Sequence, residues 1–113
     1  MANVLILPEL VRQIQKVFKK RADKIYDLMQ ELELYPSKGK PLGHAGNIVI
    51  KEIKYESFRF YFITGGHKLK CLNAQELRNL LIKFVRMSDK GNQQKTIDEI
   101  KRILDILGFD DFR

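Results

Sequence analysis

Apolar residues recur every three or four positions between Leu10 and Leu32, a spacing that collects them on one face of a helix. Pro8 suits the first turn of such a helix, because its missing N–H has no partner there in any case. The apolar stripe continues almost unbroken through residues 20–23. The pattern therefore predicts either one long helix or two helices that part in this short stretch, with Asp23 capping the second.

The middle of the chain has a different period. Glycines and prolines between residues 36 and 46 predict a loop, and the β-branched residues 47–51 predict a strand. Residues 57–63 alternate, so successive side chains point to opposite sides of a strand. The two predicted faces are Phe58, Phe60 and Phe62 on one side, and Arg59, Tyr61 and Ile63 on the other.

Two further strands and a helix are predicted toward the C-terminus. The Gly65-Gly66 pair suits a tight hairpin, followed by a strand at 67–72, one helical turn at 73–76 and a last strand at 80–87. Asn92 would start a final helix, and Gly108 would end it. The apolar stripe of that helix consists of Ile97, Ile100, Leu104 and Leu107.

This order predicts an α+β fold in a single domain spanning residues 1–113. An N-terminal helical hairpin, or one long helix, would pack with the C-terminal helix on a four-stranded antiparallel sheet. The phenylalanine face would meet the helices. The opposite face would present Arg59 and Tyr61 to solvent.

Charge is concentrated in the same part of the chain. The formal charge of the protein is +7, and the segment 36–90 alone has eleven Lys or Arg against four Asp or Glu. A charge concentrated in this way attracts polyanions. A solvated basic surface that serves solubility is the alternative interpretation.

Other classes are disfavoured by what the sequence lacks. The only cysteine is Cys71, and no Cys or His cluster has the spacing of a zinc site. We also find neither a signal-peptide pattern nor an apolar run long enough to span a bilayer. We therefore expect a cytoplasmic protein without a cofactor, a metal or a membrane contact.

The candidate functional residues are cations interleaved with tyrosines. Arginine binds phosphate through two parallel hydrogen bonds, and tyrosine stacks on unpaired bases, so the set suits single-stranded RNA. Its members are Lys51, Lys54, Tyr55, Arg59, Tyr61, Lys83 and Arg86. In the alternative structural interpretation, Arg59 is a solvated strand residue paired with Glu52 or Glu56, and Tyr61 belongs to the core.

Three short segments resemble a known family. Residues 39–43 (GKPLG), residues 55–62 (YESFRFYF) and residues 83–90 (KFVRMSDK) are similar, in order and spacing, to motifs of the RelE/ParE superfamily of bacterial and archaeal toxins. Residues 83–90 are similar to a motif near the C-terminal end of sequences in the phage-derived HigB-type branch. The resemblance extends over most of the chain, from Leu10 to about Leu107.

The resemblance implies a toxin of a toxin–antitoxin pair that cleaves mRNA on the ribosome. Arg59 would stabilise the charge that develops on the phosphate, with help from Arg86 and Lys54. Lys51, Tyr55, Tyr61 and Lys83 would contact the RNA. A cognate antitoxin would wrap the toxin and cover its basic face.

Some positions depart from the family pattern. Met87 stands where a second basic residue is expected, and no general base is evident. Residues 73–79 look inserted between two strands. Because the superfamily also contains gyrase inhibitors, two alternatives stay open: a non-catalytic module that binds RNA or protein, and a ParE-like topoisomerase inhibitor.

Overall fold

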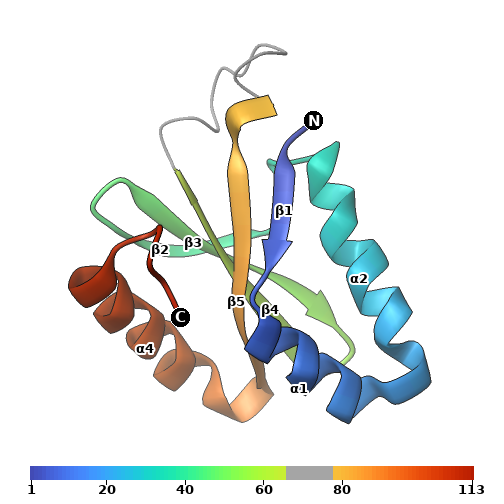
Figure 1. The fold of residues 1–113 in the computed structure, drawn as a ribbon. Coiled ribbons are helices and arrows are strands. Elements are labelled where there is room, and N and C mark those ends of the chain that lie inside the picture. The colour runs from blue at the N-terminus through green and yellow to red at the C-terminus, as the bar shows by residue number, and fades with distance from the viewer. Residues whose placement is uncertain (66–77) are drawn as a thin grey trace.

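The computed structural model describes residues 1–65 and 78–113, which form a five-stranded sheet with helices on both faces (Figure 1). The strand order is β1-β5-β4-β3-β2. The elements are β1 (Asn3–Ile6), α1 (Pro8–Phe18), α2 (Ala22–Gln30), β2 (Lys40–Ala45), β3 (Ile48–Tyr55), β4 (Phe58–Gly65), β5 (Leu81–Asp89) and α4 (Gln93–Leu107). Short 3₁₀ turns follow α1 at Lys19–Arg21, follow α2 at Glu31–Glu33 and precede α4 at Lys90–Asn92.

The sheet is mixed, so the prediction of four antiparallel strands is wrong in two respects. The apolar opening of the chain forms β1, which runs parallel to β5 with Val4 opposite Ile82. The predicted loop contains β2, an edge strand. Pro is tolerated in an edge strand because alternate N–H groups there point away from the sheet and need no strand partner. The remaining strand pairs are antiparallel. The strand predicted at 67–72 and the helical turn predicted at 73–76 lie outside the described residues.

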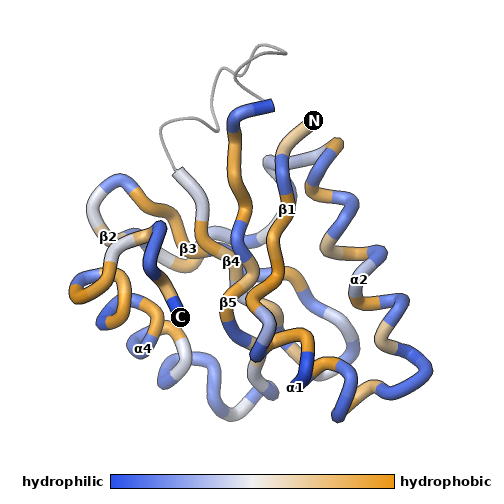
Figure 2. Tube along the Cα trace, viewed as in Figure 1, coloured by the Kyte–Doolittle hydropathy of each residue, from blue (hydrophilic) through white to orange (hydrophobic). Residues whose placement is uncertain are grey.

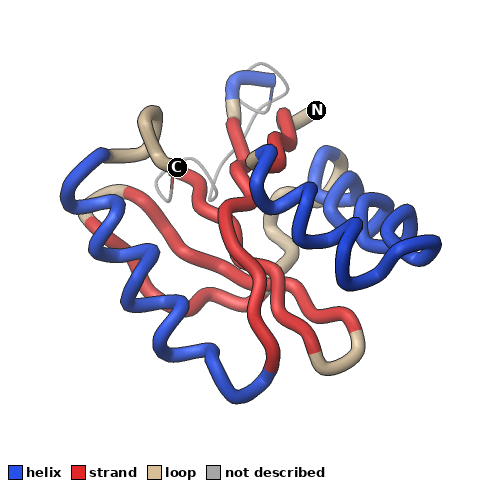
Figure 3. The backbone as a smooth tube through the Cα atoms, turned by 60° about the horizontal axis from the view of Figure 1, so that its bottom comes forward, coloured by secondary structure: helices blue, strands red, loops and turns tan. Residues whose placement is uncertain are grey.

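Helices cover both faces of the sheet, whereas the sequence suggested one (Figure 3). On the first face, α1 and α2 pack on the phenylalanine side of β4, with Phe60 and Phe62 fully buried. On the second face, α4 packs on Tyr61 and Ile63 of β4 and on Val85 of β5. Figure 2 shows the result along the chain: the central strands are largely hydrophobic, and the helices alternate between hydrophobic and hydrophilic positions.

The N-terminal region forms two helices, α1 and α2, and not the single long helix that its continuous apolar stripe also allowed. Lys19 follows α1 with a positive φ of 51°, a conformation that interrupts a regular helix. A single 3₁₀ turn then leads into α2, whose N-cap residue is Arg21. Asp23 therefore lies in the first turn of α2 and does not cap it, although its carboxylate there still suits the helix dipole.

The final helix was located closely by the sequence. Asn92 is its N-cap residue, and Gly108 ends it with a φ of 76°. Ile97, Ile100 and Leu104 are buried as predicted, but Leu107 is 40% exposed and lies outside the core.

Neither a membrane-spanning helix nor a metal site is present among residues 1–65 and 78–113. No helix there is long and apolar enough to cross a membrane, and no group of three or more His, Cys, Asp or Glu side chains could hold a metal ion.

Candidate functional site

Strand pairing gathers four charged residues on the α4 side of the sheet, beside its β2 edge. Lys40 of β2 lies opposite Glu52 of β3, and Lys54 of β3 lies opposite Arg59 of β4. Directly opposed residues share a face, and Glu52 in turn lies opposite Tyr61. We call Lys40, Glu52, Lys54 and Arg59 the basic cluster.

Arg59 is enclosed within this cluster. The residue is 8% exposed, and its Nε lies 3.8 Å from Oε1 of Glu52. Its Nη1 donates a hydrogen bond to the carbonyl oxygen of Phe58 at 3.3 Å, and its buried Nε has no hydrogen-bond partner among the described residues. The prediction of a solvent-exposed Arg59 is therefore wrong. Of the alternative interpretation, the ion pair with Glu52 is confirmed and the solvated position of Arg59 is wrong.

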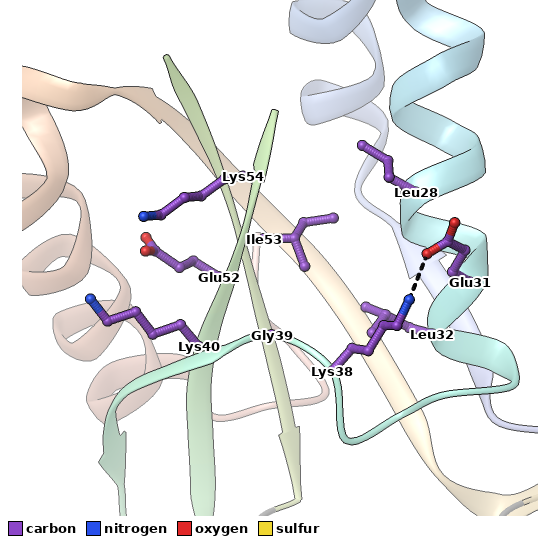
Figure 4. Close-up of a pocket in the computed structure, with 9 residues that line it drawn as sticks. All are labelled: Leu28, Glu31, Leu32, Lys38, Gly39, Lys40, Glu52, Ile53 and Lys54. Atoms are coloured by element: carbon purple, nitrogen blue, oxygen red, sulfur yellow. Dashed lines mark hydrogen bonds and ion pairs between the residues drawn. The ribbon is translucent and has the colours of Figure 1, made fainter. Parts of the chain in front are cut away.

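The lysines of the cluster are the accessible part. Lys40 and Lys54 are exposed, whereas Glu52 is 4% exposed. Figure 4 shows both lysine side chains on the same side of β3 as the Glu52 carboxylate, one on either side of it. The two residues border a groove of about 410 Å³ between α2 and the edge of β3, but their side chains point away from α2. With three cations and one carboxylate, the cluster carries a formal local charge of +2.

Arg86 lies on the same face, but its guanidinium is already hydrogen-bonded to other groups of the protein. A bulge in β5 breaks the register next to Tyr61 and places Arg86 opposite that residue, which re-aims its side chain. Its Nε donates to Oε1 of Glu99 at 3.2 Å, and its Nη2 donates to the carbonyl oxygen of Arg113 at 2.7 Å. The guanidinium is thus held by α4 and by the chain that follows it.

Tyr61 and Lys83 are buried under α4 and the segment that follows it, so their expected exposure is wrong. The Tyr61 hydroxyl lies 2.7 Å from Oγ of Ser88, and burial raises the pKa of Tyr61 above 10.0. Nζ of Lys83 donates to the carbonyl oxygen of Phe109 at 2.7 Å. Neither side chain offers a free polar group to a nucleic acid in this structure.

Lys51 and Tyr55 are on the opposite face of the sheet. They are three and one residues from Lys54 in β3, and odd separations along a strand reverse the face. Lys51 is 4% exposed and donates from Nζ to the carbonyl oxygen of Ser37 at 2.9 Å, and burial lowers the pKa of Lys51 below 10.5. Tyr55 packs edge-on against Phe18 with ring centroids 5.8 Å apart. Neither lies in the basic cluster.

Lys40 was missed as a site residue, and Glu52 was considered only as an ion-pair partner. The sequence predicts a loop at Lys40, and a loop gives no sign of pairing with β3. The alternation of residues 50–54 does place Glu52 and Lys54 on one face, and this signal was available in the sequence. Glu56, the other predicted partner of Arg59, forms an ion pair with Arg21 at 2.6 Å.

Comparisons with known proteins identify the fold. No family model matches the chain, and no curated protein matches it. Among solved structures, the chain is similar to a chain of the archaeal RelE–RelB complex from Pyrococcus horikoshii OT3, with a TM-score of 0.60 and 15% sequence identity. The match covers 80% of this protein and 96% of that chain. The protein therefore has a RelE-like fold.

Proposed function

We propose that the protein is the toxin of a toxin–antitoxin pair and cleaves mRNA on the ribosome, in the cytoplasm. The observation that carries this proposal is the placement of Lys54 opposite Arg59 on a RelE-like sheet. Arg59 is nearly buried and has a hydrogen-bond donor without a partner among the described residues. A guanidinium largely withdrawn from water attracts an anion more strongly than an exposed one, because the surrounding dielectric constant is lower.

The proposed reaction breaks the bond between phosphorus and the 5′-oxygen of the next nucleotide. The 2′-hydroxyl attacks the phosphate, a cyclic phosphate forms, and the 5′-oxygen leaves with a proton. Arg59 and Lys54 would stabilise the charge that develops on the phosphate oxygens. The Glu52 carboxylate would accept the proton of the 2′-hydroxyl, and Lys40 would supply a proton to the leaving oxygen.

The RNA surface in this proposal is smaller than the sequence suggested. Lys40 and Lys54 would attract the backbone, since they are the exposed cations of the basic cluster. Arg86 would take part only after releasing Glu99 and the Arg113 carbonyl oxygen. Lys51, Tyr55, Tyr61 and Lys83 have no part in it, because their polar groups are buried, face the other side of the sheet, or both.

A non-catalytic binding module with the same fold is the second candidate. The ion pair between Arg59 and Glu52 favours it, because the pair neutralises the cation that catalysis would use. In this case the exposed lysines would hold RNA or a partner protein without any reaction. A ParE-like topoisomerase inhibitor is the third candidate.

The partner we propose is an antitoxin. The similar archaeal structure is of a RelE–RelB complex, and a basic toxin suits an acidic partner. We also place the protein in the phage-derived HigB-type branch, on the resemblance of residues 83–90.

Expression in bacteria separates the candidates. We would compare the wild type with Lys54→Ala and with Lys24→Ala, a matched exposed lysine on α2. Growth arrest with truncated mRNA, lost in Lys54→Ala and kept in Lys24→Ala, would support the nuclease. Arrest with intact mRNA and damaged DNA would replace it with the topoisomerase inhibitor. Harmless wild-type expression would replace it with the binding module.

A further inference from the structure

Gly43 of β2 makes room for a lysine of α4 on the surface of the sheet. A Cβ atom added at Gly43 would lie 3.2 Å from Cε and 3.3 Å from Nζ of Lys101. A larger residue at position 43 would therefore crowd the end of the Lys101 side chain, and glycine leaves that space open. Lys101 is half-buried and follows Ile100, a fully buried residue of α4. The packing of α4 on the sheet thus determines where this lysine lies.

The Lys101 ammonium lies on the same face of the sheet as the basic cluster. Gly43 pairs with Ile50 of β3, which packs under α4. The next pair on this face joins Lys40 and Glu52. Ile50 and Glu52 are two residues apart, a separation that keeps the face and covers about 6.6 Å. Lys101 therefore adds a cation beside the Lys40 position, along the β2 edge.

With Lys101 included, the cations form a row along this edge. Lys54 is two residues beyond Glu52 in β3 and lies opposite Arg59. The order along the face is Lys101, Lys40, Lys54 and Arg59. Glu52 is the acidic side chain of the cluster, so four cations and one carboxylate give a formal charge of +3.

The lysines of the row are not neutralised by the protein. None of the three has an ion-pair partner among residues 1–65 and 78–113. The usual helix partners of Lys101 would be Asp98 and Asp105, three and four positions away. Asp98 instead accepts a hydrogen bond from Nε2 of Gln94 at 3.0 Å. Because neighbouring like charges repel one another, an anion bound between these lysines would relieve the repulsion.

We infer that Lys101 binds RNA and that, together with Lys40, it holds a backbone phosphate next to the one that is cleaved. The inference deepens the proposed function and rests on it for the identity of the ligand. A nucleic-acid strand carries one negative charge for each nucleotide, and cations spaced along a row suit that repeat. Contacts to phosphate fix the register of the strand and do not read its sequence. The strand would follow the β2 edge of the sheet toward α4.

RNA-binding measurements on the full chain test this assignment. The probe is a fluorescent octamer of 2′-O-methyluridine, which lacks the attacking 2′-hydroxyl of the proposed reaction and stays intact. Lys101→Met removes the ammonium and keeps an unbranched side chain. Anisotropy at several salt concentrations should show an affinity lower by about threefold and a salt dependence shallower by about 0.7, the values for one lost phosphate contact.

Two further variants separate a lost contact from other effects. Lys95→Met makes the same change of net charge at an exposed position of the same helix, and it should keep the salt dependence of the wild type. Lys101→Arg retains the positive charge and should also keep it. A shallower salt dependence in Lys101→Arg as well would show that the residue acts through its packing on Gly43, which would overturn the inference.

Three other results would also overturn it. If the wild type binds the octamer and Lys101→Met has the same salt dependence, the inference fails alone. If the wild type does not bind the octamer, the inference fails together with the RNA-binding part of the proposed function. If a glutamate octamer needs Lys101 for binding where the RNA does not, the row belongs to an acidic protein partner.

Discussion

Nε of Arg59 lies 3.8 Å from Oε1 of Glu52, and the two side chains are only 10% and 4% exposed. The pair has a clear electrostatic reason. Arg59 lies directly opposite Lys54, and like charges in that position destabilise a sheet. Glu52, diagonal to Arg59, offsets this repulsion. Because both side chains are largely removed from water, removing either one leaves the other as an uncompensated buried charge and destabilises the protein.

A double-mutant cycle measures this coupling. Glu52→Gln leaves the buried guanidinium unpaired, and Arg59→Met leaves the buried carboxylate unpaired, so each should lower the free energy of unfolding by about 3 kcal/mol. The double variant should be more stable than the sum of the two changes predicts, by about 0.5–3 kcal/mol. Urea denaturation of the four proteins gives the value. Additivity within about 0.5 kcal/mol would show that the two groups do not interact.

Gly39 is constrained by its conformation and by its neighbours. It has a φ of +99°, and an added Cβ would lie 2.8 Å from Cζ of Phe62 and 3.1 Å from the carbonyl oxygen of Glu52. Gly39→Ala should therefore cost about 1–3 kcal/mol more than the matched change Gly46→Ala. At Gly46 the φ is also positive, at +58°, but a Cβ would meet no atom within 4 Å. Thermal unfolding compares the two, and equal losses would contradict the steric argument.

The sequence predicted the helices and strands whose hydrophobic residues recur at a regular spacing, and it missed the strands that lack such a spacing. The boundaries of α4 follow from its cap residues and its apolar stripe. The strand β1 was missed because four residues are too few to show alternation, and its partner β5 lies far away in the sequence. The strand β2 was missed because Pro41 and Gly43 indicate a loop in a single sequence. Their place in an edge strand depends on pairing with β3.

The sequence predicted which face of the sheet holds Arg59 and Tyr61 but not how little of these side chains is exposed. Alternation in β4 correctly placed Arg59 and Tyr61 on one face. The sequence predicts helices on one face only and therefore an open second face, although Ile63 and Val85 belong to that second face. Lys51 shares only its charge with Lys54, because the two-residue period of the strand puts them on opposite faces.

Lys51 gives a prediction for pH dependence. Burial lowers the pKa of Lys51 below 10.5 in the folded protein. Between this lowered pKa and 10.5, the unfolded chain therefore binds more protons than the folded one. Stability from this group therefore rises with pH through that window. Lys51→Met removes both the charge and this rise. The variant should be at least as stable as the wild type near pH 7, and its advantage should shrink as the pH approaches 10.5.

Denaturant titrations of both proteins between pH 7 and 10.5 measure this trend. RNA binding is a second measurement, because Lys51 faces away from the basic cluster. Lys51→Met should keep wild-type affinity for a single-stranded RNA while Lys54→Ala loses part of it. A pH-independent difference in stability, or equal loss of RNA affinity in both variants, would contradict the placement of Lys51.

The segment after α4 covers two of the cations that the sequence assigned to RNA. Phe112 is 3% exposed, and the Arg86 guanidinium lies 5.2 Å from its ring centroid. Nζ of Lys83 donates to the carbonyl oxygen of Phe109. Removing the Phe112 ring should release this segment, because its contact with the core is what opposes the entropy of the free chain.

Phe112→Ala should lower the free energy of unfolding by about 3 kcal/mol, the lower end of the range for a buried phenylalanine, since a detached segment leaves no closed cavity. Lys83 and Arg86 would then reach solvent and phosphate. Affinity for a single-stranded RNA should rise, and its dependence on salt should steepen by about 0.7 for each added phosphate contact. Fluorescence anisotropy at several salt concentrations measures both. Ile106→Ala, on the exposed side of α4, is the matched control and should change neither, whereas an unchanged salt slope in a destabilised Phe112→Ala would show that the segment does not shield these cations.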